Sequence, residues 1–169
     1  MNLIAAAPLW LIVALCCALV AAAAEDAVRL RISNITSISV VTAAIVAGVI
    51  AGPSAMVWQN GAVFLIILVL GTAAFAGGLL GGGDVKLFAA TGLWFGLKPA
   101  IEFVAIVFIS GGVIAILYLL ARPFRHRISA TTKSARIPYG MAIALGGVAM
   151  VLLERRVWGV TTFGNFHNA

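Results

Sequence analysis

The longest uncharged stretch of this chain limits what it can fold into. Residues 32–83, 52 in all, contain no Lys, Arg, Asp, Glu or His. A transmembrane helix needs only about 20 consecutive apolar residues, so this stretch alone can hold two spans. Over the whole chain 63% of residues are hydrophobic and 9% are charged, whereas roughly a quarter of the residues of a soluble domain are charged. The sequence therefore predicts an integral membrane protein.

The membrane-spanning segments are predicted to be helices. Backbone polar groups in lipid must be satisfied within the protein, so only helices and closed barrels can span a membrane. The apolar residues here run continuously instead of alternating, which excludes a barrel. We expect one all-α, polytopic domain over residues 1–169, with about six transmembrane helices. The expected spans are 4–24, 35–53, 61–79, 85–97, 99–121 and 137–154.

The first span is expected to be retained and not removed as a signal peptide. No basic residue precedes it, and its apolar run is too long for the core of a signal peptide. The basic residues of the chain predict the orientation. With the N-terminus outside, eight Lys and Arg residues lie on the cytoplasmic side and three lie outside. Cytoplasmic loops then fall at about 25–34, 80–86 and 122–136.

The same charge pattern bears on partners. The net charge of +6 is explained by these cytoplasmic loops, so membrane lipids and not nucleic acid are the expected contacts. Asp26 and Asp84 are separated by two predicted crossings. Both are therefore expected at the cytoplasmic face.

Asp84 follows three consecutive glycines, in Gly81-Gly82-Gly83-Asp84. Each glycine weakens a helix by about 1 kcal/mol relative to alanine. Such a run permits a bend, and it clears space beside the aspartate where an extended peptide could approach. The plainer alternative is that Asp84 only caps the helix that follows.

Asp26 is the expected partner of Asp84. Ionisable residues near a bilayer are costly, so they are candidates for function. Glu25 is expected to pair with Arg29, four residues later, which leaves Asp26 less engaged. If Asp26 and Asp84 meet, repulsion keeps one carboxyl protonated while the other is ionised. An aspartic protease needs this arrangement, because the ionised group takes a proton from water and the protonated group polarises the scissile carbonyl.

Nothing in the sequence predicts a metal or a cofactor. Cys16 and Cys17 are adjacent, so on a helix they point in different directions, and neither histidine lies near an acidic cluster. A second hypothesis is a small ion- or proton-coupled transport subunit, or an assembly subunit without chemistry. Transport sites more often lie near the bilayer midplane, whereas both aspartates are expected at span ends, which favours the enzyme.

Three segments resemble the type IV prepilin peptidase family, which comprises membrane aspartic peptidases of the Gly-x-Gly-Asp kind. Residues 81–87 resemble the segment around its second aspartate. Residues 26–34 resemble the segment around its first aspartate, except that Ser33 stands in place of a proline, and residues 136–146 resemble the start of its last helix. The resemblance implies that Asp26 and Asp84 are catalytic. The motif positions that would support them or the substrate are Gly81, Gly83, Lys86, Asn34, Pro138 and Tyr139.

Two of these supporting positions carry specific expectations. Lys86 is two residues from Asp84, so it points nearly the opposite way on a helix and is expected to extend towards the interface. Asn34 is close enough in sequence to Asp26 to orient a carboxyl through a hydrogen bond.

The resemblance also implies an activity and a place in the cell. The family cleaves the basic leader of prepilins at the cytoplasmic side of the bacterial inner membrane, just before the pilin's hydrophobic helix. The chain is similar to the short form found with Flp or tight-adherence pili, which lacks the cysteine-bearing insertion of members that also methylate the new N-terminus. The resemblance implies a prepilin and other pilus-assembly proteins as partners. It does not imply N-methyltransferase activity.

Overall fold

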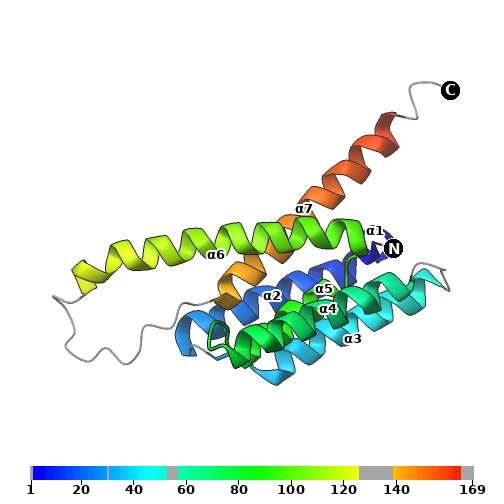
Figure 1. Ribbon diagram of the computed structural model, residues 1–169. Helices are drawn as coiled ribbons and strands as arrows, with labels where there is room; N and C mark the ends of the chain where they lie inside the picture. Colours follow the sequence, from blue (N-terminus) through cyan, green and yellow to red (C-terminus); the bar gives the residue numbers. More distant parts are fainter. Residues whose placement is uncertain (1, 30, 53–56, 126–138, 165–169) are drawn as a thin grey trace.

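A computed structural model describes residues 2–29, 31–52, 57–125 and 139–164, and every regular element in these ranges is a helix (Figure 1). This confirms the predicted all-α class. The helices are α1 (Leu3–Ala6), α2 (Leu9–Arg29), α3 (Asn34–Ala51), α4 (Val57–Ala76), α5 (Gly82–Gly92), α6 (Leu97–Arg125) and α7 (Tyr139–Gly164).

Within the described ranges, four segments are long and apolar enough to cross a membrane: α2, α3, α4 and residues Leu97–Leu117 of α6. The chain is thus a polytopic membrane protein. Helix α5 is different, because its 11 residues reach about 16 Å, roughly half the thickness of the hydrocarbon core. The count of six spans and the outside position of the N-terminus remain predictions.

Several helices begin or end beyond the predicted bounds, which shortens the expected loops. Helix α2 continues to Arg29 instead of ending at residue 24, so Asp26 lies in a helix and not in a loop over 25–34. Arg29 in the last turn interacts favourably with the helix dipole and stabilises this extension. Helix α5 begins at Gly82, so residues 82–86 of the loop predicted at 80–86 are helical. Helix α6 continues to Arg125, so the loop predicted at 122–136 is helical up to that residue. Residues 126–136 lie outside the described part.

The predicted first span is two helices, not one. Ala7 between α1 and α2 has an extended backbone, with φ −75° and ψ 142°. The cause is Pro8, which lacks an N–H and disfavours the helical conformation of the residue before it. The Leu3 N–H of α1 donates to the Trp94 carbonyl at 3.0 Å, so the short helix is fixed to the turn after α5.

The long helices alternate in direction along the bundle (Figure 1). As a result the C-terminal ends of α2 and α4 lie near the N-terminal ends of α3, α5 and α7. We call this the α5-start end of the bundle. The two helices between them, α3 and α4, bring Asp26 and Asp84 to this same end, as the even number of crossings predicted.

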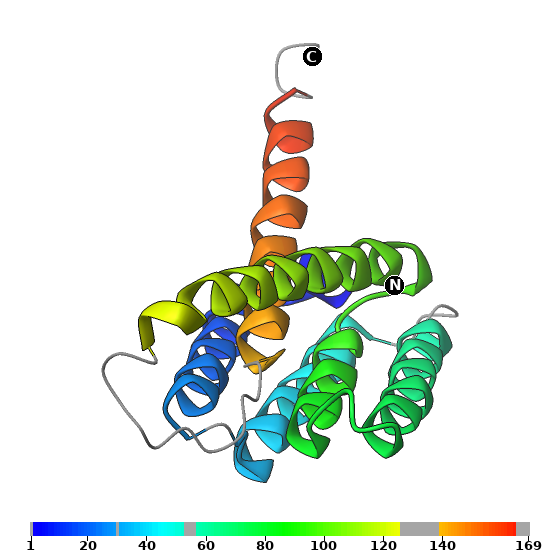
Figure 2. The same cartoon turned by 60° about the vertical axis from the view of Figure 1, so that its left-hand side comes forward.

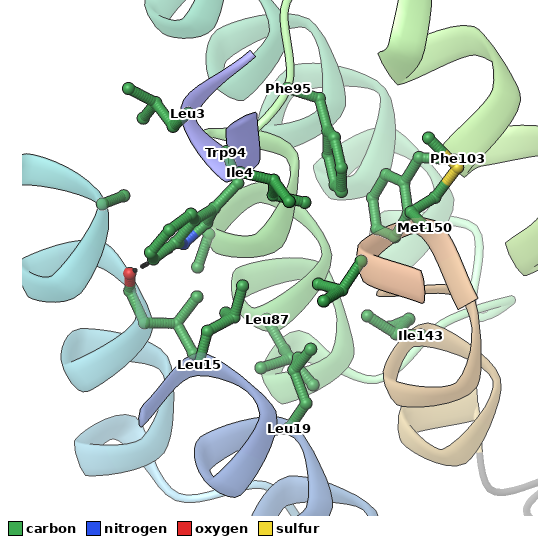
Figure 3. Close-up of a cluster of buried hydrophobic side chains, with 14 of the residues drawn as sticks. Leu3, Ile4, Leu15, Leu19, Leu87, Trp94, Phe95, Phe103, Ile143 and Met150 are labelled. Carbon is green, nitrogen blue, oxygen red and sulfur yellow. Dashed lines mark hydrogen bonds between the residues drawn. The ribbon is translucent and has the colours of Figure 1, made fainter. Parts of the chain in front are cut away.

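Helix α5 is central, because it packs against α3, α4 and α7. The aromatic residues around its far end form the middle of the core (Figure 3). Trp94, Phe95 and Phe103 are fully buried. The rings of Phe95 and Phe103 stack with centroids 4.9 Å apart, and Trp94 Nε1 donates to the Val40 carbonyl at 3.3 Å. This packing fixes α5, and with it the position of Asp84.

Candidate active site

Asp84 lies in the first turn of α5 and is buried, with 8% of its surface exposed. Gly81 is the N-cap of the helix, and its backbone N–H donates to Asp84 Oδ2 at 3.2 Å. This is the acidic half of a capping box, in which the third helical residue reaches back to the cap. Asp84 therefore helps to cap its own helix through Oδ2, but as the third helical residue and not as the N-cap of the plainer alternative.

Asp26 lies in the last turn of α2 and is 4% exposed. Its Oδ2 is buried and has no hydrogen-bond partner within the described residues. An unpaired polar atom in the interior costs about 1–3 kcal/mol. A buried acid without a clear structural role at the end of a helix is a candidate for chemistry.

The two carboxyls interact electrostatically. Burial, and after it the nearby charge of Asp26, raise the pKa of Asp84 from its ordinary value of 3.8 to about 6. The backbone N–H groups of Gly81 and Gly140 oppose the shift in pKa. Asp84 lies outside the four candidate membrane-spanning segments, at the α5-start end.

A third segment completes the site. The first turn of α7 lies against Asp26, with the backbone N–H groups of Gly140 and Met141 directed at its carboxyl. A Cβ at residue 140 would lie 2.8 Å from Asp26 Oδ2. The first N–H groups of a helix have no partner inside the helix and favour a negative group. Gly140 serves both carboxyls, since its N–H also acts on Asp84.

Gly140 and Met141 were not among the predicted site residues. The available signal was the segment 136–146, which resembles a family helix start, and a glycine placed where that helix begins. What the sequence does not reveal is that the first N–H groups of this helix meet an aspartate more than a hundred residues earlier.

The glycine run holds its neighbours close and does not leave open space. A Cβ at Gly81 would lie 2.6 Å from Asp84 Oδ2, and one at Gly83 would lie 3.2 Å from both Cβ and O of Ile32. The Ile32 side chain also reaches Gly140, where a Cβ would lie 2.7 Å from its Cδ1. Ile32 thus packs between two glycines from different helices. The space that we expected for a substrate peptide beside Gly83 is occupied by Ile32.

Glu25 does not pair with Arg29 in the described part of the chain, so that prediction was wrong. Its Oε2 accepts from the Ser33 backbone N–H at 2.8 Å and from the Thr36 hydroxyl at 3.1 Å. These donors belong to the first turn of α3, whose free N–H groups attract an acid. Glu25 therefore joins α2 to α3, while Asp26 beside it faces α7.

Asn34 and Lys86 bind each other and not the aspartates. Lys86 Nζ donates to Asn34 Oδ1 at 2.9 Å, and both side chains are exposed. This contact uses the amide oxygen of Asn34, and no hydrogen bond joins Asn34 to Asp26 within the described residues, so the predicted bond to the Asp26 carboxyl is absent there. The ammonium of Lys86 binds an amide of α3, and its extension to the membrane interface stays a prediction.

Tyr139 is the first residue of α7 and is half-buried. Its ring faces α6, because a Cβ at Gly111 would lie 3.9 Å from Tyr139 Cδ1. Pro138 lies outside the described residues. Within the described ranges no group of three or more His, Cys, Asp and Glu could hold a metal ion.

The arrangement can support acid–base chemistry on one water molecule. Two buried carboxyls on separate helices interact electrostatically. The backbone N–H of Gly81, at the start of α5, and N–H groups from α7 lie against them. Coupled carboxyls of this kind bind one proton over a wide pH range.

Comparison with known protein families matches residues 13–116 to the type IV leader peptidase family. The matched residues cover most of the chain and include Asp26 and Asp84, but not α7. Searches among curated proteins and among solved structures gave no match. Because the family match covers more than half of its length, this chain belongs to the type IV leader peptidase family and is a peptidase.

Proposed function

We propose that the protein is an aspartic endopeptidase that removes the basic leader from type IV prepilins of the Flp kind. The reaction would take place at the cytoplasmic face of a bacterial inner membrane, with Asp26 and Asp84 activating water. Family membership supports a leader peptidase. The observation that carries the finer assignment is the burial of these two carboxyls beside each other at one end of the bundle.

The pair suits peptide hydrolysis in a specific way. The raised pKa of Asp84, to about 6, favours a state in which the pair holds one proton up to about pH 6. The ionised carboxyl takes a proton from the attacking water while the protonated one polarises the scissile carbonyl. The titration belongs to the pair, so neither role is assigned to one residue.

The location of the pair fits a membrane-anchored substrate. Asp84 begins a helix at the α5-start end, and the candidate spans α3 and α4 pack against this helix together with α7. A leader that leaves the membrane at this end would arrive beside both carboxyls. The predicted excess of basic residues on that side supports a cytoplasmic position.

The test is cleavage of a Flp-type prepilin in membranes that contain the protein. Asp26→Asn and Asp84→Asn should each reduce the cleavage rate by at least about a hundredfold, within the range for loss of a general acid or base. Glu102→Gln is the control, because Glu102 is an exposed acid on α6 away from the pair. Immunoblots should show equal amounts of all variants. Cleavage by either asparagine variant at the wild-type rate would falsify the paired mechanism, and absence of cleavage by the wild type would remove the prepilin assignment.

A further inference from the structure

Helices α3 and α4 are consecutive in the chain, yet they are held apart. Each packs against α5, and extensive packing between α3 and α4 is absent in the described residues. Figure 2 shows α5 between the cyan α3 and the green-blue α4. Two grooves lie between α3 and α4, one at each end of the bundle. Together we call them the α3–α4 trough.

The groove at the α5-start end has a volume of about 370 Å³. Ser37 lines it and is 6% exposed, and its hydroxyl oxygen is buried without a hydrogen-bond partner in the described chain. The Lys86–Asn34 pair also lines this groove. Lys86 is only two residues from Asp84, so the groove begins at the level of the catalytic pair. Its lining is completed by Ile38, Val41, Phe64 and Leu68.

The groove at the other end is larger, at about 760 Å³. Gly48 of α3 and Gly61 of α4 both line it, and a Cβ at either would meet nothing within 4 Å. Asn60 also lines this groove and is 3% exposed. Its Nδ2 donates to the Leu93 carbonyl at 3.0 Å, whereas its Oδ1 is buried and has no partner among the described residues.

The two linings form continuous stripes. On α3 they run from Asn34 to Gly52 at steps of three and four residues, and on α4 from Val57 to Leu68 in the same way. Residues at these steps share one face of a helix. The α3 stripe is about 27 Å long at 1.5 Å per residue, close to the thickness of the hydrocarbon core. The α3 side of the trough is therefore long enough to cross the hydrocarbon core.

We infer that the α3–α4 trough binds the hydrophobic helix of the prepilin while its leader is cut. This inference rests on the proposed function. A helix that spans the membrane matches the length of the trough, and the glycine face of α3 allows a close approach of helix backbones. The leader then leaves the membrane beside Lys86, within one turn of Asp84.

A peptide fits the trough better than a lipid chain does. The buried oxygens of Ser37 and Asn60 lack hydrogen-bond partners within the described residues, and an unmade bond of this kind costs about 1–3 kcal/mol. An acyl chain carries no donor. A substrate helix with Ser, Thr or amide side chains supplies donors at these depths.

The first test fills the trough. Gly48→Leu and Gly61→Leu place side chains in open space, so the protein should fold normally, while the substrate helix loses its place. Each should slow cleavage of the full-length prepilin by at least about tenfold, with the loss in KM, because binding and not chemistry is affected. Gly112→Leu is the matched control, since residue 112 is an exposed glycine of α6 with nothing within 4 Å.

A second substrate separates this effect from damage to the fold. A short peptide that contains the leader and cleavage site but lacks the hydrophobic helix should be cut equally by the wild type and the two trough variants. Slower cleavage of both substrates would mean that the leucines disturb the active site, and it would overturn the inference.

The second test identifies the occupant. A photo-reactive benzoyl-phenylalanine at position 45, an exposed trough position, should crosslink to the prepilin. The same group at position 109, an exposed position of α6, should not. Crosslinks to lipid alone, or to a second copy of this chain, would overturn the inference. If the wild type cleaves prepilin while both trough variants remain fully active, the trough inference fails and the proposed function stands.

Discussion

Gly81 donates its backbone N–H to Asp84 Oδ2 at 3.2 Å, and a Cβ on Gly81 would lie 2.6 Å from the same oxygen. The absence of a side chain at residue 81 is therefore what lets Asp84 fold back on its own helix.

Gly81→Ala should displace the Asp84 carboxylate and slow prepilin cleavage by at least about tenfold. The added methyl group and Oδ2 cannot both keep their positions at 2.6 Å. Gly82→Ala is the matched control, because its Cβ would make only ordinary contact with Phe75 at 3.5 Å. Equal rates for the two variants would show that the close approach at residue 81 has no role. The rates are measured from the fraction of prepilin processed over time.

Gly140→Ala should displace the Asp26 carboxyl, as Gly81→Ala should displace that of Asp84. The new Cβ would lie 2.8 Å from Asp26 Oδ2 and 2.7 Å from Ile32 Cδ1, and overpacking of this kind costs typically about 1–3 kcal/mol. We expect a lower unfolding temperature in detergent together with at least about a tenfold loss of cleavage. Gly112→Ala, in open space on α6, should change neither. Full activity of Gly140→Ala would contradict the role of α7 at the site.

The raised pKa of Asp84 predicts how stability depends on pH. Because the folded state holds the proton up to about pH 6 and the ordinary pKa is 3.8, folding is favoured most at low pH. The stabilisation that comes from the proton on Asp84 falls as pH rises from about 4 to about 6. Above about pH 6 stability no longer changes through this group. The stabilisation is at most about 3 kcal/mol, at 1.36 kcal/mol per pKa unit. Thermal unfolding of wild type and Asp84→Asn, compared across this range, measures it, and parallel curves would rule it out.

The same shift predicts the pH dependence of cleavage. Above about pH 6 the pair loses the shared proton, so kcat/KM should fall as pH rises further. A rate that is constant from pH 6 to 8 would oppose a shared proton.

Glu25 and Asp26 are adjacent acids with different predicted roles. Glu25→Ala removes the acceptor for the Ser33 N–H and the Thr36 hydroxyl, so it should destabilise the protein by about 0.5–2 kcal/mol, as loss of a helix cap does. Cleavage by the folded protein should persist, whereas Asp26→Asn should abolish it. Denaturant unfolding and cleavage assays on the same preparations separate the two effects. Loss of cleavage in a fully stable Glu25→Ala variant would reverse this assignment.

The core around α5 should be sensitive to truncation. Phe103→Ala removes a fully buried ring that contacts Phe88 and Phe95, and such a change costs about 3–5 kcal/mol. Phe108→Ala on the same helix should cost far less, because that ring is 71% exposed. Thermal unfolding in detergent compares the two, and similar losses would show that the ring stack does not support the fold.

The sequence predicted the helical class and the meeting of Asp26 with Asp84, because both follow from simple counts. Long apolar runs can only be membrane helices, and an even number of crossings returns the chain to the same side. The lengths of α2 and α5 were less predictable. Their ends depend on tertiary contacts, such as the capping of α3 by Glu25 and the turn that holds Trp94.

The contacts inside the site could not be predicted from the sequence for the same reason, because they depend on tertiary structure. Spacing on one helix suggested that Glu25 binds Arg29, but the first turn of α3 offers Glu25 two donors at once. Asn34 was assigned to Asp26 because the two are close in sequence, whereas Lys86 is closer in space. Ile32 reads as an ordinary apolar residue, and only the assembled bundle shows it between Gly83 and Gly140.

The position of α7 has a consequence for how the protein is made. A ribosome that has synthesised residues 1–116 has already delivered both aspartates to the membrane, but not the N–H groups of Gly140 and Met141 that meet Asp26. These donors are therefore among the last parts of the site to be made, and Asp26 lacks them until α7 has been synthesised and packed.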